Sequence, residues 1–360
     1  MIPGDLSAEL TRLLISLTGA GALPRAATSL TANGTWRQAR TPVGPSPGSY
    51  TTSLPFELAS LSARPPEAIA SQLATRLARL PWIGTAQATD GYLTLTVTPD
   101  HLAGLPARIV AAGSACAHSD ALAGRELTAP HPPDLAAVPT WHQAWRAQHA
   151  ALIGRFGEAA GAQVLFFHSE SKAAGAQAPK AGVSDPPAAV AYFGLDAVRF
   201  ALAAAPTPRS PAIERQLGKP LDMANAFVMI RHARADAAST RRWAADLGLR
   251  THQRSHQAAA AAWSATLAPA ELRLIDLMSW LPERIAAAYR RRRPADLVGY
   301  LAHLAGAWLD CSEACSALPF RGRGGGSQTD TEARLELAEA ASTTLAAGLG
   351  LLGVAAPAMM

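Results

Sequence analysis

Three long amphipathic segments in the C-terminal part of the chain constrain its fold most. They cover residues 270–289, 295–315 and 331–352. In the first segment, large apolar residues recur at spacings of three and four and share one helical face: Leu274, Leu277, Leu281 and Ile285. Helices with one apolar face must bury it against one another. The sequence therefore predicts an all-α bundle at this end of the chain.

The first hundred residues follow a different pattern. Residues 6–18 have helical periodicity, a second helical segment runs from Leu54 to Leu80 with a break at Arg64-Pro65-Pro66, and residues 91–97 alternate as a strand. Residues 41–49 are rich in Pro, Gly and Ser and read as a loop. We expect a compact α+β module that ends near residue 112.

Composition excludes several classes of protein. Of 32 basic residues only Lys172, Lys180 and Lys219 are lysines, and the net charge of +5 permits a polyanionic partner without requiring one. The three cysteines, Cys116, Cys311 and Cys315, form neither a disulfide framework nor a zinc-ligand set. No run of about 18 uninterrupted apolar residues predicts a membrane span. We expect a cytoplasmic protein without metal or cofactor.

Four motifs resemble those of arginyl-tRNA synthetases. They are residues 48–54 (GSYTTSL), residues 91–94 (GYLT), residues 194–200 (GLDAVRF) and residues 223–234 (MANAFVMIRHAR), followed by a helical region that closes on residues 351–360. The resemblance implies an N-terminal module that contacts the outer corner of tRNA and a C-terminal anticodon-binding domain of the DALR type. It also implies tRNA, specifically an arginine acceptor, as the partner.

The resemblance points to candidate tRNA-binding residues. In the N-terminal module they are Tyr92, which offers an aromatic face for a base, and Thr94, which replaces the family's Asn. In the C-terminal domain, Ile230 stands where the family has a base-stacking Tyr. The other candidates are Arg199, Phe227, Arg231, His232, Arg234 and Met360.

A run of four arginines, Arg290 to Arg293, precedes Pro294 at the expected end of a helix. Two interpretations remain open. The arginines complement the negative end of the helix dipole and aid solubility, or they form a cluster that contacts phosphates. Both interpretations place these side chains at the surface.

The middle of the chain is where the family carries its catalytic core. A strand at residues 125–130 and a helix at 141–161 resemble its beginning, and the nucleotide-binding His-x-Gly-His motif aligns with Thr140-Trp141-His142-Gln143. Neither its glycine nor its paired histidines are present. The Met-Ser-Lys loop aligns with residues 177–184, where Lys180 is the one lysine. A doubly wound nucleotide-binding fold needs two βαβ halves, which this middle is too short to hold.

We therefore expect three parts: an N-terminal α+β tRNA-contacting module (1–112), a degenerate, truncated α/β (Rossmann-like) remnant (113–190) and an all-α DALR-type domain (191–360). The expected function is tRNA binding by a catalytically degenerate synthetase-like protein that neither binds ATP nor acts as an enzyme, and that presents tRNA to a partner enzyme. His142, Gln143 and Lys180 are then relics of the nucleotide site. A residual arginine–tRNA ligase and a helical protein-interaction scaffold remain alternatives.

Overall fold

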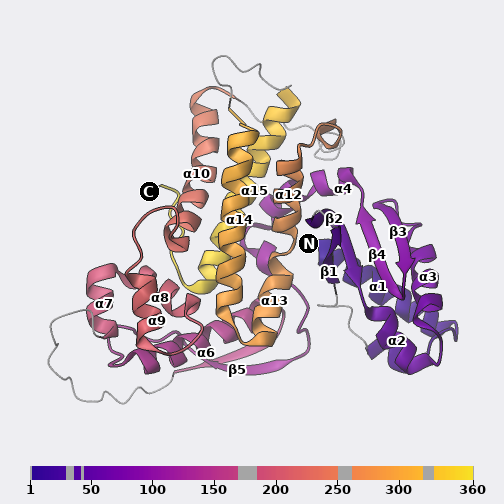
Figure 1. Cartoon of the computed structure of the whole chain (residues 1–360), viewed down its shortest axis with the longest axis horizontal. Coiled ribbons are helices and arrows are strands. Elements are labelled where there is room, and N and C mark those ends of the chain that lie inside the picture. The colour runs from indigo at the N-terminus through magenta and orange to yellow at the C-terminus, as the bar shows by residue number, and fades with distance from the viewer. Residues whose placement is uncertain are drawn as a thin grey trace. The chain divides into compact units, whose positions relative to one another are not determined.

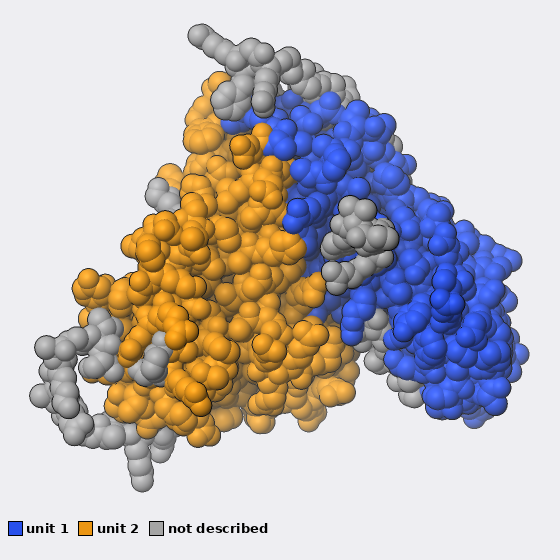
Figure 2. All heavy atoms as spheres, in the orientation of Figure 1, with its two compact units in different colours: residues 1–108, 250–283, 314–337 blue, residues 109–249, 284–313, 338–360 orange. Residues whose placement is uncertain are grey.

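The computed structural model describes residues 2–29, 36–41, 44–168, 185–249, 262–318 and 328–359. The chain forms two compact units, each built from segments distant in sequence (Figure 2). Unit 1 comprises residues 1–108, 250–283 and 314–337. Unit 2 comprises residues 109–249, 284–313 and 338–360.

A four-stranded antiparallel sheet lies in unit 1 (Figure 1). Its order is β1-β2-β4-β3, with the strands β1 (Trp36–Thr41), β2 (Gly44–Thr52), β3 (Ile83–Thr89) and β4 (Tyr92–Val97). Asp90 and Gly91 both have positive φ in the turn between β3 and β4, as a tight Asp-Gly hairpin requires.

The predicted loop at residues 41–49 was wrong, because most of it is strand β2. Its prolines, Pro45 and Pro47, precede the pairing of β2 with β4, which starts at Ser49 opposite Thr96. Along this first part β2 pairs with β1 alone. Proline is tolerated where a strand has a neighbour on one side only, since no second ladder needs its missing N–H. The Pro, Gly and Ser content therefore predicted a loop, whereas pairing with β1 and β4 makes the segment a strand.

Unit 1 also contains the helices α1 (Ile2–Gly19), α2 (Leu54–Ser62), α3 (Pro66–Leu77) and α4 (Pro99–Ala103) and the 3-10 turn η1 (Arg25–Ser29). Helix α5 (Leu105–Ala112) begins in unit 1 and ends in unit 2, which contains the 3-10 turn η2 (Gly113–Ala117). The predicted break between α2 and α3 is confirmed: Ala63 adopts the left-handed conformation and Pro66 begins α3. Leu6, Leu10 and Leu14 of α1 are buried in the core.

Unit 2 contains one βαβ motif. Strand β5 (Glu126–Pro130), helix α6 (Trp141–Ala159) and strand β6 (Gln163–Phe167) follow one another, and the two strands are parallel. Gly154 lets α6 approach the sheet closely, because a Cβ there would lie 2.2 Å from the Cβ of Ala129. The two strands form a sheet of their own among the described residues. This is the predicted truncated α/β remnant.

The remaining elements are helices: α7 (Pro186–Phe193), α8 (Leu195–Ala204), α9 (Ser210–Leu217), α10 (Ala226–Asp246), α12 (Pro269–Ser279), α13 (Leu281–Arg291), α14 (Pro294–Ala314) and α15 (Gln328–Leu352). The predicted apolar face is confirmed, since Leu274, Leu277, Leu281 and Ile285 are all buried. The helix predicted over 270–289 is in fact two. Pro282 has no N–H to continue the first helix, so the chain turns at Trp280.

Helix α15 is unusually apolar. A stretch of 18 residues within 330–352 has a mean hydropathy of 1.2, and the helix is long and apolar enough to cross a membrane by length and composition alone. The same stretch is 61% buried within the protein, as the core helix of a globular domain is. In unit 2 its C-terminal half packs on α14, where Gly348 leaves room for Leu301, and pairs with α10 through Arg241 and Glu339. The predicted fold class, with an all-α C-terminal bundle, is confirmed.

Candidate nucleic-acid interface

The motif at residues 194–200 binds the chain's own C-terminal segment in unit 2. Arg199 donates from Nη1 to the carbonyl oxygen of Gly353 at 3.0 Å, and the Ala355 amide donates to Oδ2 of Asp196 at 3.2 Å. Burial, and then the charge of Arg199, lower the pKa of the neighbouring Arg155. Gly353 adopts a positive φ that ends α15. The Arg199 guanidinium is therefore engaged in holding the end of this helix.

The first turns of α10 bring two candidate residues together. Asn225 caps the helix by accepting a hydrogen bond from the Phe227 amide at 3.1 Å. The Phe227 ring lies 5.0 Å beneath the Arg231 guanidinium and 5.3 Å from the Phe200 ring. A guanidinium stacked on an aromatic ring is held in place with its edge free for a phosphate or base. Phe227 and Arg231 thus form one candidate contact.

Other α10 candidates point in different directions. Ile230 is completely buried and belongs to the core. His232 is exposed. Arg234 is partly buried and lines a cavity of unit 2. Residues four apart share a helical face, so Ile230 and Arg234 lie on the same side of α10, whereas His232 lies on the other side.

The four arginines from Arg290 to Arg293 are all exposed. Helix α13 ends within the run, and Arg292 adopts a left-handed conformation with φ of 52°. Asp296 accepts from Arg291 Nη1 at 3.3 Å and lies 3.5 Å from Arg293 Nε. Both earlier interpretations agree with this placement, because exposed cations at a helix C-terminus stabilise the helix and remain accessible to phosphates.

Tyr92 and Thr94 lie on strand β4 of unit 1. Tyr92 is 47% exposed and makes an edge contact with Phe56, with ring centroids 5.0 Å apart. The Oγ1 atoms of Thr94 and Thr51 share a hydrogen bond of 2.9 Å across the sheet. The Thr94 hydroxyl is therefore committed within the sheet, whereas Tyr92 keeps about half of its surface for a ligand.

The segment aligned with the nucleotide-binding signature begins helix α6. The Thr140 hydroxyl accepts a hydrogen bond from the Gln143 amide at 3.3 Å, so the helix supplies its own cap. Trp141 is only 4% exposed and packs in a cluster with residues of α7, α8 and α9. His142 and Gln143 are exposed. Lys180 and Met360 lie outside the described residues.

A buried polar network in unit 1 was missed by the sequence analysis. Asp276 of α12 is fully buried, and its carboxylate accepts hydrogen bonds from the Gly48 amide at 3.0 Å, the Tyr50 hydroxyl at 2.9 Å and Gln38 Nε2. Burial and the Asp276 charge raise the pKa of Tyr50 well above its usual value, so its phenol remains a donor. A single acidic residue on an apolar helical face was the one signal in the sequence.

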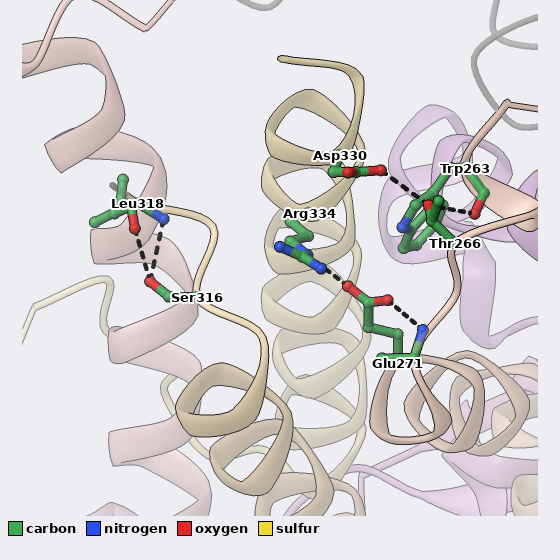
Figure 3. Close-up of polar contacts among 8 residues, drawn as sticks. Trp263, Thr266, Glu271, Ser316, Leu318, Asp330 and Arg334 are labelled. Atoms are coloured by element: carbon green, nitrogen blue, oxygen red, sulfur yellow. Dashed lines mark hydrogen bonds and ion pairs between the residues drawn. The ribbon is translucent and has the colours of Figure 1, made fainter. Parts of the chain in front are cut away.

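A second buried carboxylate of unit 1 ties α12 to α15. Glu271 is fully buried; it accepts from Arg334 Nε at 2.7 Å and from the Ala268 amide at 2.8 Å (Figure 3). One carboxylate thereby caps α12 and binds a helix over sixty residues away. The same close-up shows Thr266 donating to Asp330 at 2.9 Å.

Comparison with known proteins identifies the relatives of this chain. Residues 244–360 match the DALR anticodon binding domain. Arginine–tRNA ligases of Micrococcus luteus and Frankia alni are each 33% identical, over 174 residues (48% of this chain, 30% of the relative) and 167 residues (46% and 29%). That of Cereibacter sphaeroides is 40% identical over 87 residues, which are 24% of this chain and 15% of the relative.

The fold of the chain is similar to that of a solved synthetase structure. Arginyl-tRNA synthetase from Thermus thermophilus superposes with a TM-score of 0.59 at 14% identity, covering 99% of this chain and 100% of that chain. In sequence, the chain spans less than a third of the length of the two ligases named first. Residues 244–360 are therefore a DALR anticodon-binding domain, in a chain that is similar to arginine–tRNA ligases over about half of its length.

Proposed function

We propose that this protein binds tRNA, specifically an arginine acceptor, without activating arginine. The DALR domain and the ligases with which it shares sequence support tRNA as the partner. On the protein side, the exposed run Arg290–Arg293, the stacked Arg231 and the half-exposed Tyr92 supply phosphate and base contacts. Backbone contacts by arginines fix position, and aromatic faces accept unstacked bases.

The observation that carries the loss of catalysis is Trp141. A helix N-terminus with free amide groups favours the binding of a phosphate group. Here Thr140 caps that terminus and the indole of Trp141 fills the core beside it. We infer that residues 113–190 are the degenerate remnant between two binding parts, 1–112 and 191–360. ATP–pyrophosphate exchange with arginine is expected to stay at background, and exchange above background would restore the ligase interpretation.

A tRNA-binding protein without chemistry of its own acts by presenting tRNA to an enzyme or withholding it. We propose presentation to a partner enzyme in the cytoplasm. Sequencing of RNA that copurifies with the full chain is the direct test. Enrichment of arginine acceptors supports the proposal, whereas RNA without tRNA overturns it.

The proposed contact between tRNA and the run Arg290–Arg293 is tested by reversing the charge of two of these arginines. The variant Arg291→Glu/Arg292→Glu is expected to weaken tRNA binding by about 10-fold or more and to reduce the salt slope by about 2, because fewer counterions are released. The matched control is Arg209→Glu/Arg215→Glu, which changes the same charge at exposed arginines elsewhere in unit 2. Equal affinity of both variants would place the footprint elsewhere.

One observation favours a second function. The position where the family has a base-stacking Tyr is Ile230, which is fully buried. A bundle that no longer reads the anticodon can serve as a scaffold for a protein partner. Binding of total tRNA that is unchanged between low and high salt would favour this scaffold over the tRNA-binding function.

A further inference from the structure

A cavity of about 420 Å³ lies entirely within unit 2. Three elements line it: the 3-10 turn η2 with the residue after it, helix α10 and the C-terminal half of α15. The polar residues in its wall are Ser114, His118, Arg234, Ser342 and Thr343. Ser114 and His118 are exposed, so the cavity is open to solvent on their side.

Helix α15 presents mostly small side chains to this space, with Leu351 as the one large side chain among its described lining residues. Ser342, Ala346 and Gly350 follow one another at intervals of four, and Thr343 and Ala347 form the adjacent row. Residues four apart lie on one helical face. These five residues carry at most hydroxyl and methyl groups and therefore occupy little of the space between α15 and Arg234. The floor of the cavity is thus a helical face of hydroxyl and methyl groups.

Arg234 is a cation without an internal counterion. Its Nε and Nη1 atoms are shielded from solvent and have no hydrogen-bond partner among the described residues. Burial, and then the nearby charge of Arg242, lower the pKa of Arg234. No Asp or Glu is among the described residues that line the cavity. Arg234 is partly buried, and its two shielded nitrogens have lost water without gaining an acceptor; this is costly, so an anion bound there would stabilise the protein.

We propose that this cavity is a binding site for a phosphate group. Arg234 supplies the positive charge, and His118, Ser114, Ser342 and Thr343 supply further donors. Three hydroxyls and an imidazole can surround a tetrahedral anion, while the guanidinium makes charge-assisted hydrogen bonds to its oxygens. The volume admits a phosphate together with part of the molecule that carries it.

The phosphate has two possible sources, the backbone of RNA or a small phosphate ester. If it belongs to tRNA, this inference rests on the proposed function and names one of its contacts. If it belongs to a free phosphate ester, the site stands independently of tRNA. The two sources share the same chemistry in the cavity, and experiments with each of them separate the two.

Titration of the full chain with inorganic phosphate and with AMP, at constant ionic strength, tests the site. Methyl NMR signals of Ala346 and Leu351, which line the cavity, are expected to shift and saturate. Arg234→Gln is expected to weaken phosphate binding by about 10-fold or more, as for loss of a charged hydrogen-bond donor. Ala347→Leu keeps the arginine but fills the cavity, and is expected to abolish the saturable shift.

The control variant is Arg215→Gln, an exposed arginine of unit 2 that does not line the cavity. It is expected to bind phosphate like the natural chain. Signals that do not saturate, or that saturate equally in Arg234→Gln and Ala347→Leu, would overturn the site.

Titration with tRNA separates this inference from the proposed function. Loss of tRNA affinity in Arg234→Gln and Ala347→Leu, with competition by inorganic phosphate, assigns the cavity to an RNA phosphate. Saturable phosphate binding by a chain that does not bind tRNA keeps the site and refutes the proposed function. Unchanged tRNA binding by both variants, together with no phosphate saturation, refutes the site and keeps the proposed function.

Discussion

Two fully buried carboxylates of unit 1 and one partly buried arginine of unit 2 differ in how their hydrogen-bonding groups are satisfied. In unit 1, the fully buried Glu271 and Asp276 are each surrounded by hydrogen-bond donors supplied by the chain. In unit 2, Arg234 keeps two nitrogens without a partner among the described residues. A satisfied buried charge fixes the positions of the elements around it, whereas an unsatisfied one leaves binding capacity for a ligand. By this difference, Glu271 and Asp276 are structural groups, whereas Arg234 is a candidate for binding a ligand.

The largest effect is expected for Asp276→Ala. It leaves the Gly48 amide and the Tyr50 hydroxyl without their acceptor in the core of unit 1. The free energy of unfolding should fall by about 3–5 kcal/mol, the range for breaking a buried charged network. Hydrogen exchange of β2 and α12 amides during urea titration measures it. Asp276→Asn keeps an acceptor and should lose less than half as much; equal losses would show that packing dominates.

His149 in unit 2 differs from both cases, because this buried side chain is neutral at pH 7. Its ring stacks on Trp145 at 3.7 Å and its Nε2–H donates to the Leu202 carbonyl oxygen at 3.0 Å. Burial lowers the pKa of His149 to about 4, although the Leu202 hydrogen bond raises it. An unfolded histidine titrates near 6.5, so on acidification the unfolded chain binds the proton first.

The expected consequence is a loss of stability on acidification. The free energy of unfolding attributable to His149 is constant above about pH 6.5 and falls by about 2–3 kcal/mol as the pH falls to about 4. Denaturant titrations of the natural chain and of His149→Gln between pH 7 and pH 4 measure the difference. Parallel pH profiles for the two proteins would contradict the neutral, buried histidine.

A moderate effect is expected for Glu271→Gln in unit 1. Glutamine keeps an acceptor for the Ala268 amide but loses the charge that pairs with Arg334. Unfolding should become easier by about 1–2 kcal/mol, and less so at high salt. Thermal unfolding in low and high salt measures this change. Glu67→Gln, at an exposed position of α3 in unit 1, removes the same charge elsewhere and serves as the control.

The smallest effect on stability is expected for Arg234→Gln without ligand. Because this guanidinium has two nitrogens without a partner, removing its charge should change the free energy of unfolding by no more than about 0.5 kcal/mol and can be stabilising. Urea titration without phosphate measures it. A loss as large as that of Asp276→Ala would mean that Arg234 is a structural group, and the contrast between the units would disappear.

Periodicity and motifs predicted much of this molecule from local information. The helical face formed by Leu274, Leu277, Leu281 and Ile285, the break before Pro66 and the exposed arginines after Tyr289 all follow from spacing and from residue chemistry. The split of the first bundle helix at Trp280 was missed, although Pro282 gave the signal. Strand β2 was missed because its sequence is typical of a loop, and only pairing with β1 and β4 makes it a strand.

The candidate site likewise has features that the sequence predicts and features that only the tertiary structure shows. The sequence by itself determined the family resemblance, the helical C-terminal region and the absence of the signature glycine and histidine pair around Trp141. Only the tertiary structure decided that Arg199 binds Gly353, that Ile230 is buried and that Arg234 lines a cavity. The physical reason is that spacing along the chain fixes the face on which a side chain lies. Its hydrogen-bond partners can come from segments far away in sequence, as Gly353 does for Arg199, and folding alone brings them together.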